Sequence, residues 1–107
     1  MEKDKYNVLI NGMGNIGTTL ANMLVHYQTE LCLNKIYVVK RSIHPWNKTE
    51  RDFLENKGIV ICSQNAENGL VPVNSIINDV DYIFEATANG VSFKEPMLFT
   101  HRGISGP

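Results

Sequence analysis

The sequence is short of the features that mark several functional classes. Its 10 basic and 11 acidic residues leave a net charge of −1, so no charge excess favours nucleic acid or an anionic membrane surface. No apolar run approaches the roughly 20 residues that a membrane-spanning helix needs. The 2 cysteines form neither a CxxC pair nor a disulfide framework. We therefore expect no nucleic acid and no membrane among the partners, and we identify no metal ligands.

What remains is the composition of an ordinary globular protein, 43% apolar and 20% charged over 107 residues. This length supports one domain. The first ten residues contain too short an apolar run for a signal peptide, which predicts a cytoplasmic protein. In that compartment Cys32 and Cys62 are expected to be reduced thiols that pack in the core.

Apolar runs alternate with amphipathic segments along the chain. We expect strands at residues 6–11, 33–39, 59–62 and 80–86, because these runs are apolar and rich in β-branched residues. Helical spacing predicts helices at residues 15–29, 49–56 and 74–78. The alternation predicts an α/β, Rossmann-like, three-layer fold with a parallel sheet of about four strands, which is an incomplete doubly wound fold.

Three glycines separate the first expected strand from the first helix, in the stretch NGMGNIG. In dinucleotide-binding folds the first allows a tight turn, the second lets the pyrophosphate approach the backbone, and the third lets the helix pack closely on the strand. The helix N-terminus adds unpaired N–H groups and a partial positive charge. A strand-to-helix turn without a ligand is the alternative. The residues we predict to contact a cofactor here are Asn11, Gly12, Met13, Gly14, Asn15, Ile16 and Gly17.

The second expected strand leads into Lys40, Arg41 and Ser42. A site for NAD has an Asp or Glu at this place to accept a hydrogen bond from the ribose 2′-hydroxyl, and residues 37–45 contain no acid. Two cations and a hydroxyl suit a 2′-phosphate instead, since each charge-assisted bond contributes roughly 1.5–3 kcal/mol. We predict NADP as the cofactor, with NAD as the second choice. A solvated basic loop is the alternative.

The last expected strand ends in small and polar residues, Thr87, Ala88, Asn89 and Gly90. Ligands of open α/β sheets lie outside the carboxyl ends of the strands, at the point where the strand order reverses. We therefore expect these four residues to lie beside the glycine turn, along the path of the cofactor. An ordinary turn is the alternative, because Asn-Gly is a common turn pair.

Taken together, the three motifs resemble the coenzyme-binding domain of glyceraldehyde-3-phosphate dehydrogenases of the archaeal type. VLINGMGNIGTTLANML is similar to the opening of that family, KRS to the end of its second strand, and TANGV to the motif before its catalytic domain. The similarity covers about residues 6–94. It implies that the glycine turn binds the pyrophosphate, that residues 40–42 hold the 2′-phosphate, and that residues 87–90 flank the nicotinamide-side ribose.

The catalytic half of that family has no counterpart here. Its nucleophilic cysteine and the histidine that activates it follow the TxNG motif, whereas Cys32 and Cys62 precede it. Because acyl transfer needs both a nucleophile and a base, we predict no catalytic residues. The final segment, PMLFTHRGISGP, departs from the family. Its apolar residues Met97, Leu98 and Phe99 are expected to pack on the sheet edge or on a second copy.

The sequence thus predicts an NAD(P)-binding, Rossmann-like domain over residues 1–92, followed by a divergent C-terminal tail over residues 93–107. The domain resembles the coenzyme domain of a glyceraldehyde-3-phosphate dehydrogenase and is not expected to be catalytically complete alone. Two alternatives stay open. One is an aldehyde or homoserine dehydrogenase-like oxidoreductase completed by a partner chain. The other is a homodimerisation module that binds no ligand.

Overall fold

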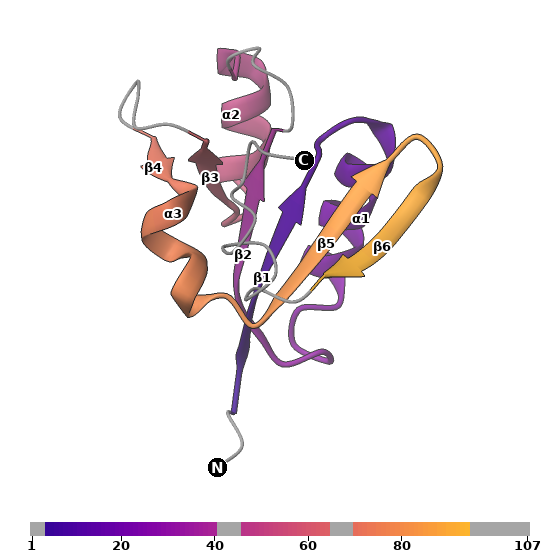
Figure 1. Cartoon of the computed structure of the whole chain (residues 1–107), viewed down its shortest axis with the longest axis vertical. Coiled ribbons are helices and arrows are strands. Elements are labelled where there is room, and N and C mark those ends of the chain that lie inside the picture. The colour runs from indigo at the N-terminus through magenta and orange to yellow at the C-terminus, as the bar shows by residue number, and fades with distance from the viewer. Residues whose placement is uncertain (1–3, 41–45, 65–69, 95–107) are drawn as a thin grey trace.

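A computed structural model describes residues 4–40, 46–64 and 70–94 (Figure 1). The chain forms an α/β structure around a 6-stranded sheet with the order β4-β3-β2-β1-β5-β6. β1 to β5 run parallel, and β6 is antiparallel to β5. The strands are β1 (Tyr6–Asn11), β2 (Leu33–Val39), β3 (Val60–Ser63), β4 (Val71–Pro72), β5 (Tyr82–Thr87) and β6 (Gly90–Lys94).

β1 is the centre of the sheet, with β2 on one side and β5 on the other. Its residues Val8, Leu9 and Ile10 are at most 2% exposed. A parallel strand that is covered on both faces has a continuous run of apolar residues in its sequence. Such runs define β1 and β2, and both strands begin and end at the predicted residues. The predicted α/β class with a largely parallel sheet is confirmed.

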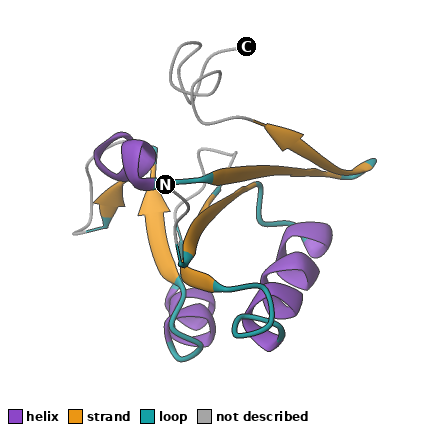
Figure 2. Cartoon of the chain, turned by 90° about the horizontal axis from the view of Figure 1, so that it is seen from below, coloured by secondary structure: helices purple, strands orange, loops and turns teal. Residues whose placement is uncertain are grey.

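Helices cover both faces of the sheet (Figure 2). On one face, α1 and α2 pack against the side of β1 that carries Val8 and Ile10. On the other, Val73 and Ile77 pack against Leu9. The helices are α1 (Asn15–His26), α2 (Lys48–Glu55) and α3 (Val73–Ile76), which continues as a short 3-10 helix, η1 (Ile77–Asp79).

The predicted count of about four strands is wrong, because the sheet has 6. β4 has only 2 residues, too few to show any periodicity in the sequence. β6 follows β5 through a tight hairpin in which Thr87 pairs with Gly90. The alternation of Val91, Ser92 and Phe93 is the strand signal, but it is short and follows an Asn-Gly pair that also predicts a loop. β6 crosses the predicted domain boundary at residue 92, and residues 95–107 of the predicted tail lie outside the described residues.

The two cysteines differ in environment. Cys62 is buried in β3, as predicted, and burial raises the pKa of its thiol to about 12. Cys32 is exposed, so the prediction that it packs in the core is wrong. It occupies the turn before β2 with a φ of 58°, a left-handed conformation that places it outside regular structure.

Helix ends fall close to the predicted positions. α1 ends at His26 rather than at residue 29, and α2 spans Lys48–Glu55 rather than residues 49–56. Within the part of the chain that the structure describes, no helix has both the length and the apolar character to cross a membrane.

Candidate functional site

The strand order reverses between β1 and β5, and this places a crevice at their carboxyl ends. The chain runs from β1 outwards to β2, β3 and β4, and then returns to pair β5 with the other side of β1. In open α/β sheets such a reversal is the usual place for a ligand, because the two connections leave in opposite directions. The glycine turn after β1 lies at this reversal.

Two of the three glycines are required by the backbone. Gly12 has a φ of 106°, a conformation that side chains strongly disfavour, and its N–H donates to the carbonyl of Val39 at 2.9 Å. A Cβ atom at Gly17 would lie 1.9 Å from the carbonyl oxygen of Gly12. Gly17 therefore allows the start of α1 to approach the turn closely, whereas the prediction for the third glycine was close packing of the helix on the strand.

Gly14 is different, because no contact requires a glycine there. Apart from its two chain neighbours, none of the described residues has a heavy atom within 4 Å of the position that a Cβ would take, and its φ of −83° suits any residue. Gly14 is the N-cap of α1, and it supplies no side chain to cap the helix. The first turn of α1, residues 15–18, also has no acidic side chain. The N–H of Thr18 donates to the carbonyl of Gly14 at 2.9 Å, whereas the N–H groups of residues 15–17 have no side-chain cap among the described residues. These groups lie at the positive end of the helix dipole, beside the open space over Gly14.

A pocket of about 740 Å³ occupies this space. Its walls are residues 12–17, Lys40, Glu50 and residues 86–88. The structure thus brings together the glycine turn, the end of β2 and the end of β5, as the sequence predicts. Three predicted residues, Asn11, Asn89 and Gly90, are not among those walls. Arg41 and Ser42 lie outside the described residues.

Asn11 faces away from this pocket because of strand alternation. It lies on the side of β1 that carries Leu9, where it is 3% exposed, and its Nδ2 donates to Oε2 of Glu85 at 2.5 Å. Asn11 and Glu85 are register partners on β1 and β5. The pair therefore joins the two strands on either side of the reversal. Glu85 was not predicted as a site residue, although it is a charged residue in an otherwise largely apolar strand.

The end of β5 divides into two parts. Thr87 and Ala88 line the pocket, whereas Asn89 and Gly90 form the hairpin to β6. Gly90 has a φ of 132°, and the N–H of Asn89 donates to Oγ1 of Thr87 at 3.2 Å. Asn89 and Gly90 therefore form an ordinary turn, which was the alternative to a role in cofactor binding.

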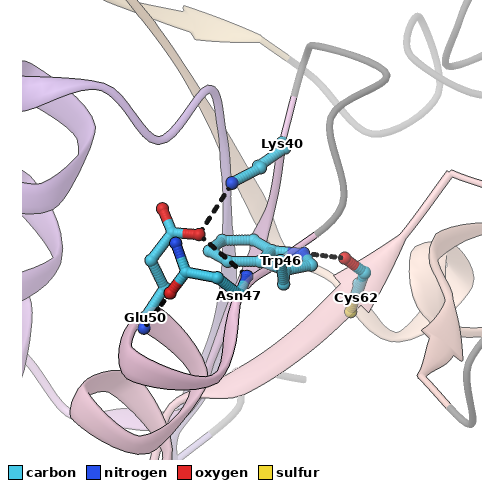
Figure 3. A network of polar contacts seen from close by, with 5 residues as sticks. All are labelled: Lys40, Trp46, Asn47, Glu50 and Cys62. Carbon is cyan, nitrogen blue, oxygen red and sulfur yellow. Dashed lines mark hydrogen bonds and ion pairs between the residues drawn. The ribbon is translucent and has the colours of Figure 1, made fainter.

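Lys40 lies in a network that the sequence did not predict (Figure 3). Its Nζ is 2.8 Å from Oε1 of Glu50 and 4.9 Å from the ring centre of Trp46. The indole Nε1 of Trp46 donates to the carbonyl of Cys62 at 3.1 Å, which fixes the ring against β3. The Lys40 side chain is 17% exposed and that of Glu50 35%. The predicted phosphate-binding cation is therefore already paired with a carboxylate inside the pocket.

Glu50 also closes the N-terminus of α2. Its backbone N–H donates to Oδ1 of Asn47 at 2.8 Å, and its Oε1 accepts from the N–H of Asn47 at 3.1 Å. Partial burial raises the pKa of Glu50, but the hydrogen bonds from Lys40 and Asn47 and the charge of Lys40 outweigh it, so the pKa lies below its ordinary value. Glu50 is therefore ionised at neutral pH. The sequence pattern N-x-x-E signals this capping box, but not its proximity to Lys40.

A second, smaller pocket of about 220 Å³ lies between α1 and α2. It shares Met13 and Glu50 with the first pocket. Its other walls are mostly apolar or aromatic: Thr18, Trp46, Thr49, Phe53 and Leu54.

Among the described residues, no three His, Cys, Asp or Glu side chains gather to hold a metal ion. Comparison with known families, curated proteins and solved structures finds no match to this chain. The geometry of the site therefore carries the functional proposal.

Proposed function

We propose that this chain is an NAD(P)-binding domain, cytoplasmic, with NADP as the preferred ligand and NAD as the second choice. The observation that carries the proposal is the open space over Gly14, beside a helix N-terminus that no described side chain caps, in a pocket at the strand reversal. A pyrophosphate in this space would accept hydrogen bonds from the first N–H groups of α1 and would compensate its dipole. Gly12 and Gly17 support the same proposal, because each has the backbone role that a dinucleotide turn requires.

The preference for NADP rests on Lys40, with Arg41 and Ser42 next to it in the sequence. An ammonium group has three donors, so Nζ of Lys40 can bind a phosphate oxygen while it keeps Glu50. The ion pair nevertheless reduces the charge that a 2′-phosphate meets. We therefore expect the preference to be smaller than two free cations would give.

The proposal remains one of binding rather than catalysis. Cys62 is buried with a pKa of about 12, so its thiol is a poor nucleophile at neutral pH. Cys32 precedes β2 and lies at the amino ends of the parallel strands, where its carbonyl accepts from the N–H of Tyr6. The pocket lies at the carboxyl ends. Of the described residues, neither cysteine is thus placed to attack a substrate beside the cofactor, and an oxidoreductase activity would need a partner chain.

Calorimetric titration of the chain with NADP, NAD and 2′,5′-ADP tests this proposal. We expect NADP and 2′,5′-ADP to bind alike and NAD to bind more weakly, because the discriminating phosphate lies on the adenosine side. Replacing Lys40 by Met should remove most of the difference, whereas Lys48→Met is the matched control, since Lys48 is exposed and pairs with Asp52 on the surface of α2. If none of the three ligands binds at millimolar concentration, the proposal is wrong.

One observation favours the alternative of a dimerisation module. β6 is an edge strand, and its apolar residues Val91 and Phe93 are 47% and 58% exposed. The Phe93 ring lies against the rings of Tyr82 and Phe84 of β5, tilted to the first and edge-to-face with the second, which extends the aromatic surface. Edge strands of this kind pair readily with other chains. Light scattering that gives twice the chain mass at high concentration, with no effect of nucleotide on melting, would support this alternative.

A further inference from the structure

The small pocket between α1 and α2 adjoins the space assigned above to the pyrophosphate. Met13 and Glu50 line both, so a ligand whose phosphates lie over Gly14 can continue past these two residues without crossing the sheet. Met13 comes from the glycine turn and Glu50 from the first turn of α2. The junction of the two pockets is therefore formed by the glycine turn, which would bind the pyrophosphate, and by the residue of α2 that pairs with Lys40.

The walls of the small pocket suit a flat aromatic group. Trp46 and Phe53 contribute aromatic rings to these walls, and Met13 and Leu54 add apolar contact. The indole of Trp46 is held by its hydrogen bond to the Cys62 carbonyl, so it need not be ordered when a ligand binds. Phe53 is 46% exposed, and a ring bound beside it would cover it.

We infer that this pocket binds the adenine base of the dinucleotide, an inference that rests on the proposed function. The adenine then lies between α1 and α2, and its ribose lies at the junction, where Lys40 meets the 2′-phosphate and the Glu50 carboxylate accepts a hydrogen bond from the ribose 3′-hydroxyl. The pyrophosphate lies over Gly14. The nicotinamide half extends the other way, towards Thr87 and Ala88.

Trp46 provides a direct test, because it is the one tryptophan of the sequence. Its fluorescence is titrated with NADP and with adenosine monophosphate, and then with nicotinamide mononucleotide and inorganic pyrophosphate, which lack adenine. We expect the two adenine ligands to quench the emission and the other two to leave it unchanged. Quenching by nicotinamide mononucleotide and not by adenosine monophosphate would overturn the inference, since the opposite half of the cofactor would then occupy the pocket.

A variant that fills the pocket gives a second readout. Thr49 is exposed on α2 and lines the small pocket but not the large one, so Thr49→Phe should obstruct the base. We expect calorimetry to show at least a tenfold loss of affinity for NADP, on the scale of a lost base–aromatic stack, and no change for pyrophosphate. Thr19→Phe is the matched control, because Thr19 is exposed on α1 and lines neither pocket.

The outcomes separate this inference from the proposed function. If NADP binds, yet its affinity is unchanged in Thr49→Phe and the Trp46 emission does not respond, the base lies elsewhere and only the inference fails. If neither NADP nor pyrophosphate binds to the unmodified chain, the proposed function and the inference fail together.

Discussion

The N-termini of α1 and α2 both lie beside the large pocket, and they are built in opposite ways. α2 satisfies its own N-terminus with a capping box, in which Asn47 and Glu50 exchange hydrogen bonds. α1 has Gly14 as its N-cap and, within the described chain, no side-chain cap. Because an Asn or Asp N-cap stabilises a helix by only about 0.5 kcal/mol more than a glycine does, the chain forgoes a small gain at α1. The sequence therefore supplies a side-chain cap to α2, whereas the described residues supply none to α1, the helix that follows the glycine turn.

The largest expected effect on stability comes from Gly17, where α1 lies close to the glycine turn. Gly17→Ala would place a Cβ 1.9 Å from the Gly12 carbonyl oxygen, so α1 or the turn must move. We expect a loss of about 3 kcal/mol in the free energy of unfolding, measured by denaturant titration. Gly14→Ala is the control, because its Cβ meets open space among the described residues, and its stability should stay within about 0.5 kcal/mol. Equal losses in both variants would contradict this account.

The next effect concerns the capped helix. Asn47→Ala removes the side chain that accepts from the Glu50 N–H, and we expect a loss of about 1 kcal/mol in denaturant unfolding. Asn56→Ala, at the other end of α2, serves as the control and should change stability by no more than about 0.5 kcal/mol. An equally large loss of stability in Asn56→Ala would show that the capping box makes no specific contribution to the free energy of unfolding.

The charge of Glu50 adds a smaller effect that depends on pH. Its folded pKa lies below the ordinary value of 4.5, so the stability that ionised Glu50 contributes is fully present above about pH 4.5 and is lost as the pH falls through the lower, folded pKa. We expect Glu50→Gln to cost about 0.5 kcal/mol at pH 7 and less at pH 3. Thermal unfolding across this range measures the difference. Glu55→Gln, at the C-terminal end of α2, should not show a cost at pH 7.

The smallest effect on stability comes from giving α1 the cap that it lacks. Gly14→Asp keeps an allowed backbone and adds an acceptor and a negative charge at the N-terminus, so we expect a gain of about 0.5 kcal/mol. The same carboxylate would occupy the place of the pyrophosphate, and calorimetry should show that dinucleotide binding is lost. A stabilised variant that still binds NADP as tightly as the unmodified chain would show that the α1 N-terminus is not the anion site.

The sequence predicted the parts of this molecule that depend on local backbone geometry. β1, β2 and the roles of Gly12 and Gly17 follow from an apolar strand that meets a tight turn and a helix, all within a few residues. Asn11 was predicted to contact the cofactor, but the two-residue period of β1 places it opposite Glu85. Glu50 was missed because its place beside Lys40 depends on how α2 packs against β3, which no local pattern encodes. β6 was missed because an Asn-Gly pair predicts a hairpin and a loop equally well.

The hairpin between β5 and β6 limits how the sheet can be extended. In a complete doubly wound fold, a further parallel strand would pair with the side of β5 that faces away from β1. Here β6 already takes those backbone hydrogen bonds over 5 residue pairs, from Ile83 with Lys94 to Thr87 with Gly90. A second mononucleotide-binding half therefore cannot add to the sheet in the usual parallel order. Any chain that completes a nicotinamide site must approach over the pocket mouth or along the outer edge of β6.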